Sequence, residues 1–82
     1  MLCRAVLIKL KSDNGLFTTE PGVPLGKVYW VYPESIQRGE FRHEPTGQHH
    51  HAQIIYLEDG TWMPLELLTV TKEIKGELEV LQ

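Results

Sequence analysis

Alternating apolar residues mark the first predicted strand, over residues 3–10. This segment is rich in strand formers and runs into a turn cluster at residues 12–15, Ser-Asp-Asn-Gly. Successive side chains of a strand point to opposite faces. The pattern therefore predicts one face with Val6, Ile8 and Leu10 and another with Ala5, Leu7 and Lys9.

The next apolar run predicts a short second strand, Val28 to Tyr32. Two prolines and two glycines make the preceding residues 16–26 a loop. Pro33 follows the run directly and is expected to end the strand. Residues 34–51 have few apolar positions, so they are predicted to form a long inserted loop, with room for a short strand near residues 40–43.

A third strand, Ala52 to Glu58, leads into the turn Asp59-Gly60. A two-residue Asp-Gly loop favours a type I′ turn, which fixes the register of the hairpin. Pro64 should then end the pairing, and residues 65–68 can form one tight helical turn. The predicted pairs are Glu58 with Thr61, Leu57 with Trp62, Tyr56 with Met63, and Ile55 with Pro64.

The remaining residues, 70–81, alternate loosely around Lys75-Gly76. Periodicity alone leaves two alternatives open for this tail, a further hairpin or a helical extension. Four to six short strands without a long helical pattern are typical of a small barrel or a strongly twisted sheet.

Apolar side chains occur on both faces of the predicted strands. A single-layer antiparallel sheet normally has one polar face, so two alternatives follow. Either the barrel covers both faces, or one face is a surface for a partner or a second copy, because aromatic and Met residues are enriched at such interfaces. The candidate partner-binding residues are Trp30, Tyr32, Phe41, Tyr56 and Met63.

Charge and size narrow the function classes. The net charge is −3 and the basic residues are scattered, which argues against nucleic acid as the main partner. A nucleic-acid module remains an alternative if Lys9, Lys11, Lys27, Arg38 and Arg42 converge near Trp30 or Tyr32. With 82 residues the core is thin, which favours a binding module over an enzyme.

A single cysteine, Cys3, excludes an internal disulfide. The apolar run at residues 5–8 is too short for a signal peptide or a membrane span, so a cytoplasmic location without membrane association is expected. No pairing of Cys3, Ser12 or Ser35 with a histidine has the spacing of a known catalytic arrangement. We therefore expect a protein that is not an enzyme and needs no cofactor.

Four histidines lie in the predicted inserted loop. Because adjacent residues of an extended chain point to opposite sides, only His49 and His51 of the run 49–51 could chelate one ion together. His43 could join them if the loop folds back. These three are weak candidates for metal ligands, and the predicted protein has no specific metal site.

Two motifs together resemble a known family. Residues 25–31, Leu-Gly-Lys-Val-Tyr-Trp-Val, and residues 55–68, with an acidic-Gly hairpin followed by Pro64, are similar to small SH3-like barrel proteins of bacteriophages and mobile elements. The resemblance covers residues 3–70 and implies an all-β, five-stranded SH3-like barrel over residues 1–70. The inserted loop 34–51 and the extension 71–82 depart from the family pattern.

The resemblance implies no activity, because this fold hosts many functions. Together with the absence of catalytic spacing, it leads us to expect a phage-like accessory protein that binds a host or viral protein in a bacterial cell and modulates it. The alternatives are a nucleic-acid module and a protein that binds metal through the histidines.

Overall fold

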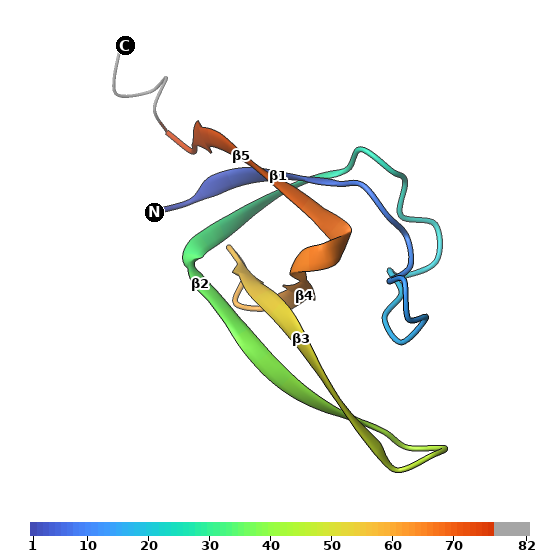
Figure 1. Ribbon diagram of the computed structural model, residues 1–82. Helices are drawn as coiled ribbons and strands as arrows, with labels where there is room; N and C mark the ends of the chain where they lie inside the picture. Colours follow the sequence, from blue (N-terminus) through green and yellow to red (C-terminus); the bar gives the residue numbers. More distant parts are fainter. Residues whose placement is uncertain (77–82) are drawn as a thin grey trace.

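The protein is all-β. Its structure, a computed structural model, describes residues 1–76 and contains no α-helix within them. Five antiparallel strands form one sheet in the order β4-β3-β2-β1-β5 (Figure 1). The strands are β1 (Cys3–Leu7), β2 (Val28–His43), β3 (Gln48–Leu57), β4 (Trp62–Pro64) and β5 (Leu68–Ile74), with a 3-10 turn, η1 (Leu65–Leu67), before β5.

The sheet curls but is not closed. β2 is shared by two halves, since its first residues pair with β1 and its remaining part pairs with β3. β4 and β5 form the two edges, and no pairing joins them in the described residues. The prediction of an all-β, five-stranded domain is confirmed, whereas closure into an SH3-like barrel is not.

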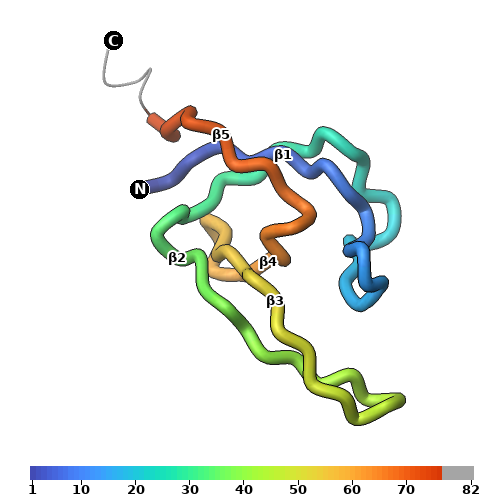
Figure 2. Tube along the Cα trace, viewed as in Figure 1, coloured from blue at the N-terminus to red at the C-terminus, as the bar shows by residue number. Residues whose placement is uncertain are grey.

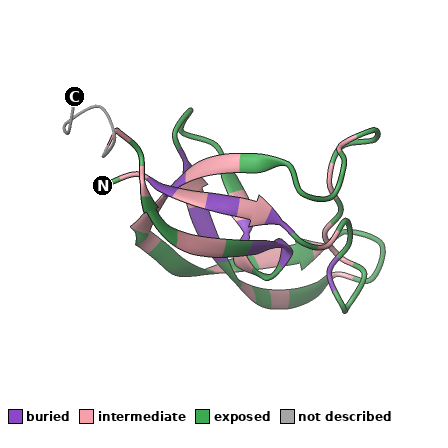
Figure 3. Ribbon diagram, turned by 90° about the horizontal axis from the view of Figure 1, so that it is seen from above, coloured by how far each residue is buried: buried purple, intermediate pink, exposed green. Residues whose placement is uncertain are grey.

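The core lies where the two halves of the sheet face each other. Ala5 and Leu7 of β1 are buried, and Ile8 is 48% exposed. β1 ends at Leu7 and not at Leu10 as predicted, but the predicted division into two faces is right within it, and the alanine face points inward. The whole core cluster consists of Ala5, Leu7, Val31, Ile55, Leu57, Leu67 and Leu68 (Figure 3).

The prediction that Pro33 ends the second strand is wrong. β2 continues to His43, and its register against β3 shifts between Tyr32 and Gln37. Pro33 lies inside this irregular stretch, outside the regular ladder, so its missing N–H leaves no pairing unmade. The Ser35 hydroxyl bridges the gap, since it donates to the Tyr32 carbonyl and accepts from the Tyr56 N–H at 2.5 and 2.8 Å.

The predicted inserted loop 34–51 is in fact a β-hairpin. β2 and β3 pair continuously from Gln37 and Ile54 out to His43 and Gln48, where a tight turn with Gly47 at φ 71° connects them. Figure 2 shows this hairpin projecting from the body of the molecule. We call residues 37–53 the hairpin arm, and none of them is buried.

The hairpin at Asp59-Gly60 exists, but its predicted register is wrong by one residue. Tyr56 lies opposite Trp62, Ile55 opposite Met63, and Ile54 opposite Pro64. Only Gly60 has a positive φ, so the type I′ turn, which needs two such residues, does not form. A three-residue loop closes instead, with the Leu57 N–H donating to the Thr61 carbonyl at 2.7 Å.

The one-residue difference exchanges the faces of β4. Met63 now shares the inner face with Ile55 and packs against the core, whereas Trp62 shares the outer face with Tyr56. Pro64 ends β4 as predicted, and the predicted helical turn is confirmed as η1.

The first part of the predicted C-terminal extension belongs to the sheet. β5 pairs with β1 up to Ile74, so residues 71–74 are strand. Of the two alternatives for this segment, the hairpin required a strand here and the helical extension did not. The rest of that prediction, from residue 77 onward, lies outside the described residues. Among the described residues, no helix has the length and apolar character needed to cross a membrane.

Candidate protein-binding site

Three aromatic side chains from distant parts of the chain form a cluster beside the hairpin arm. Phe17 comes from the loop between β1 and β2, Phe41 from the arm, and Trp62 from β4. The Phe41 ring centroid lies 5.0 Å from that of Phe17 and 5.1 Å from that of Trp62, and the Phe17 and Trp62 centroids are 6.3 Å apart. We call these three residues the aromatic cluster; Trp62 remains 41% exposed.

Gly39 allows the Phe41 ring to lie close to the arm. A Cβ atom at Gly39 would come within 2.9 Å of two carbons of that ring, which is closer than van der Waals contact permits. Gly39 and Phe41 share one face of β2, and Ala52 lies opposite Gly39 on β3. A glycine within a strand often marks such a close approach.

The Phe17 side of the cluster is held by a buried serine. Ser12 is 4% exposed, and its hydroxyl accepts from the Phe17 N–H at 3.0 Å and donates to the Asn14 side chain at 2.6 Å. The Ser12 N–H in turn donates to the Phe17 carbonyl at 2.9 Å. These bonds close residues 12–17 into a compact turn, so Phe17 is presented in a defined position.

Glu66 of η1 fastens the same loop to the body. Its carboxylate accepts from the Asp13 backbone N–H at 2.7 Å and from the Lys9 ammonium at 3.4 Å. Lys9 also contacts the Asp13 carboxylate at 3.0 Å, and its pKa is raised, chiefly by the hydrogen bond to Asp13. The loop that carries Phe17 is therefore tied to η1 through both Lys9 and Asp13.

A cleft of about 460 Å³ opens next to the aromatic cluster. Phe17 and Trp62 form part of its wall, and Tyr29 and Met63 contribute further apolar surface. Charged groups also line it: Glu20, Asp59 and Lys27, the last with its ammonium 5.0 Å from the centroid of the Tyr29 ring. The arrangement can accept an apolar side chain and place a charge beside it.

Asp59 supplies a fixed negative charge at this cleft. The Thr61 hydroxyl and the Thr61 backbone N–H donate to its carboxylate at 2.6 and 2.9 Å. Because both bonds favour the ionised form, the pKa of Asp59 is lowered from its usual value.

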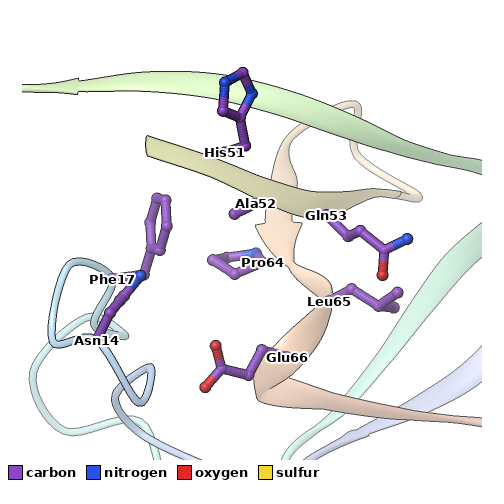
Figure 4. A pocket seen from close by; sticks show the side chains of 8 residues that line it. All are labelled: Asn14, Phe17, His51, Ala52, Gln53, Pro64, Leu65 and Glu66. Atoms are coloured by element: carbon purple, nitrogen blue, oxygen red, sulfur yellow. The ribbon is translucent and has the colours of Figure 1, made fainter. Parts of the chain in front are cut away.

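A second, smaller hollow of about 320 Å³ lies on the other side of Phe17 (Figure 4). Pro64 and Leu65 form its apolar part, and its polar part consists of Asn14, His51, Gln53 and Glu66. The Glu66 carboxylate in this hollow already accepts a hydrogen bond from the Asp13 N–H. The hollow therefore lies where the loop is attached to η1. Phe17 thus separates two hollows of different character.

The five residues predicted to bind a partner are brought together only in part: Tyr56 lies opposite Trp62, whose ring contacts Phe41, and Met63 and Trp30 lie elsewhere. Phe41 is in the aromatic cluster, and Met63 packs against the core. Tyr32 and Tyr56 face each other across β2 and β3 and are half-buried. Trp30 is half-buried opposite Arg4, with the Lys75 ammonium 5.8 Å from its ring centroid.

Sequence reasoning missed Phe17 and Trp62. Phe17 follows a cluster of turn formers in a loop, where the short apolar pair Leu16-Phe17 carries no periodic signal. The predicted type I′ register pairs Trp62 with Leu57, whereas in the structure Trp62 lies opposite Tyr56. The available signal for Phe17 was its position five residues after Ser12 in a turn-forming segment.

The basic residues of the nucleic-acid alternative divide between the segment that joins β1 to β2 and the hairpin arm. Lys9 contacts Asp13 and Glu66, and Lys27 lies over Tyr29. Arg38 and Arg42 are on the hairpin arm, opposite Gln53 and His49, and Lys11 forms an isolated bridge with Thr18.

The histidines divide between the two faces of the hairpin arm. His49 lies opposite Arg42 and His51 opposite Glu40, whereas His50 lies opposite Phe41. His43 Nδ1 is 2.9 Å from the Thr46 hydroxyl. In the part of the chain that the structure describes, no three His, Cys, Asp or Glu side chains converge as a metal site.

Comparison with known proteins gives no relative: no family model, no curated protein and no solved structure matches this chain.

Proposed function

We propose that the protein is a non-enzymatic binding module, which recognises another protein through the aromatic cluster and the cleft beside it. The observation that carries the proposal is the presentation of Phe17 and Trp62. Phe17 is fixed by Ser12, and Trp62 is 41% exposed at the rim of a 460 Å³ cleft. Exposed, pre-positioned aromatic residues are typical anchors of protein interfaces.

The chemistry of the cleft suggests the kind of segment it would accept. Tyr29 and Met63 provide apolar surface for an inserted side chain, and Asp59 keeps a charged carboxylate nearby. Lys27 is engaged with the Tyr29 ring. We therefore favour a partner segment with an apolar anchor and a neighbouring basic residue.

We further propose that the fold is an open variant of the SH3-like barrel, as the resemblance implies. The strand order β5-β1-β2-β3-β4, the bend that divides β2 and the turn η1 before the last strand support this assignment. A phage-like accessory role that modulates a host protein would fit such a module.

Affinity capture from bacterial lysate tests the function. The wild-type chain should retain a stoichiometric partner, and Trp62→Ser should lose it because the rim of the cleft is removed. Trp30→Ser is the matched control, because Trp30 lies away from the cleft and receives the same chemical change.

Circular dichroism must show that both variants are folded, and Tyr32→Ser replaces the control if Trp30→Ser is not. Recovery of no partner by the wild type, or equal capture by Trp62→Ser, would count against the proposal.

A further inference from the structure

The charged face of the hairpin arm carries two histidines with one residue between them. His49 and His51 lie on the regular part of β3, opposite Arg42 and Glu40 respectively. Residues two apart on a strand share a face with their Cα atoms about 7 Å apart, a separation that two imidazole rings can bridge. Both are exposed, whereas His50 points to the opposite face with Phe41.

Glu40 orients the first of these rings. Its Oε1 lies 2.8 Å from His49 Nδ1, a hydrogen-bonding distance between two exposed side chains. When Nδ1–H donates to the carboxylate, the neutral ring has its lone pair on Nε2, directed away from Glu40. Metal-bound histidines are commonly held in this way, with the other ring nitrogen donating to a carboxylate.

The second ring lies at the edge of the hollow behind Phe17. Figure 4 shows His51 pointing away from Phe17 and Pro64, so its ring is on the outer side of that hollow. Arg38 and Arg42 flank Glu40 on this face of β2, and Arg42 reaches toward the turn. A Cβ at Gly47 would lie 3.8 Å from its Nη2 atom.

We propose that His49 and His51 form a two-histidine chelate for a divalent transition-metal ion such as Zn²⁺, with Glu40 as the positioning residue for His49. Imidazole nitrogen is a preferred ligand of these ions. Two protein ligands leave the remaining coordination positions to water. The site is on the opposite face of the arm from Phe41, so it does not depend on the proposed protein-binding cleft.

Isothermal titration of the full chain, without an affinity tag, with zinc chloride tests the proposal. The wild type should bind saturably, at up to one ion per chain. His49→Gln and His51→Gln should each weaken binding by more than about tenfold, since each removes a ligand. Glu40→Gln should weaken it by about tenfold, the usual effect of losing a partner that orients a metal ligand.

His50→Gln is the matched control, because it removes a neighbouring imidazole from the opposite face. It should keep the wild-type affinity, and circular dichroism should show all four variants folded. The proposal is overturned if the wild type shows no saturable binding. It is also overturned if His50→Gln weakens binding as much as His51→Gln does, which would identify adventitious binding to any histidine of the run.

Discussion

The body of the sheet and the hairpin arm are both regular β-structure, yet different forces hold them. The body buries fully apolar side chains such as Leu7 and Ile55, both at most 1% exposed. The arm buries none of its residues and depends on its backbone ladder and on the contact of Phe41 with Phe17 and Trp62. Isolated two-stranded hairpins are marginal in water, so this contact with the loop matters.

The aromatic cluster therefore has two roles. It supports the outer half of the arm through Phe41, and its other two members, Phe17 and Trp62, form part of the wall of the cleft. Substitution of a buried residue in the body should therefore destabilise the whole protein. Substitution within the aromatic cluster should loosen the arm and leave the body folded.

Leu7→Ala should have the largest effect. The side chain is 1% exposed in a thin core, and loss of a buried leucine costs about 2–5 kcal/mol of unfolding free energy. Urea denaturation followed by circular dichroism measures it. Ile8→Ala, next along the chain but 48% exposed, is the control and should change stability by less than about 1 kcal/mol. Equal losses in the two variants would contradict the assignment of the inner face.

Gly39→Ala tests the support of the arm. The new methyl group would meet the Phe41 ring at 2.9 Å, and crowding of this kind costs about 1–3 kcal/mol. Urea denaturation should show that this cost disappears when Gly39→Ala is made together with Phe41→Ala. A cost that persists in the double variant would mean that backbone conformation, and not the ring, requires glycine.

Ser12→Ala tests the loop that presents Phe17. The change leaves the Phe17 N–H without its acceptor, at a cost of about 1–2 kcal/mol. Hydrogen exchange should accelerate at the Phe17 amide and remain unchanged in β1 and β5. Unchanged exchange at Phe17 would show that the loop is held by other contacts, such as those of Glu66.

Asp59 should give the smallest effect, and one that depends on pH. Its folded-state pKa is lowered by hydrogen bonds from Thr61, so its contribution to stability is present above the unfolded pKa and is lost as the pH falls through the folded pKa. Thermal unfolding should show wild type more stable than Asp59→Asn at neutral pH. This difference should shrink in acid, and a constant difference would contradict the assigned pKa direction.

The sequence predicted the body of the fold better than the arm. β1, the loop after it, the Asp59-Gly60 hairpin and the turn η1 all have local signals: apolar alternation, turn formers or a proline. The arm has none, because its stability comes from a backbone ladder and from an aromatic contact between residues far apart in the chain. A strand that carries polar residues on both faces has no apolar alternation, so its sequence alone resembles that of a loop.

Two errors had the same physical origin, a local rule applied without its tertiary setting. Pro33 does not end β2 because it lies in a stretch where the ladder is already interrupted. Asp59 does not adopt a positive φ, so the loop has three residues and the register moves by one. That shift explains why Trp62 was missed and why Met63 shares a face with Ile55.

The unpaired outer edges of the hairpin arm have a consequence for the evolution of this chain. Neither β1 nor β4 pairs with the arm, so its length is not fixed by any neighbouring strand in the described part of the chain. Insertions of two residues in each strand would extend its reach and keep every side chain on its present face. The arm is thus a segment that can be lengthened or shortened in steps without redesign of the core.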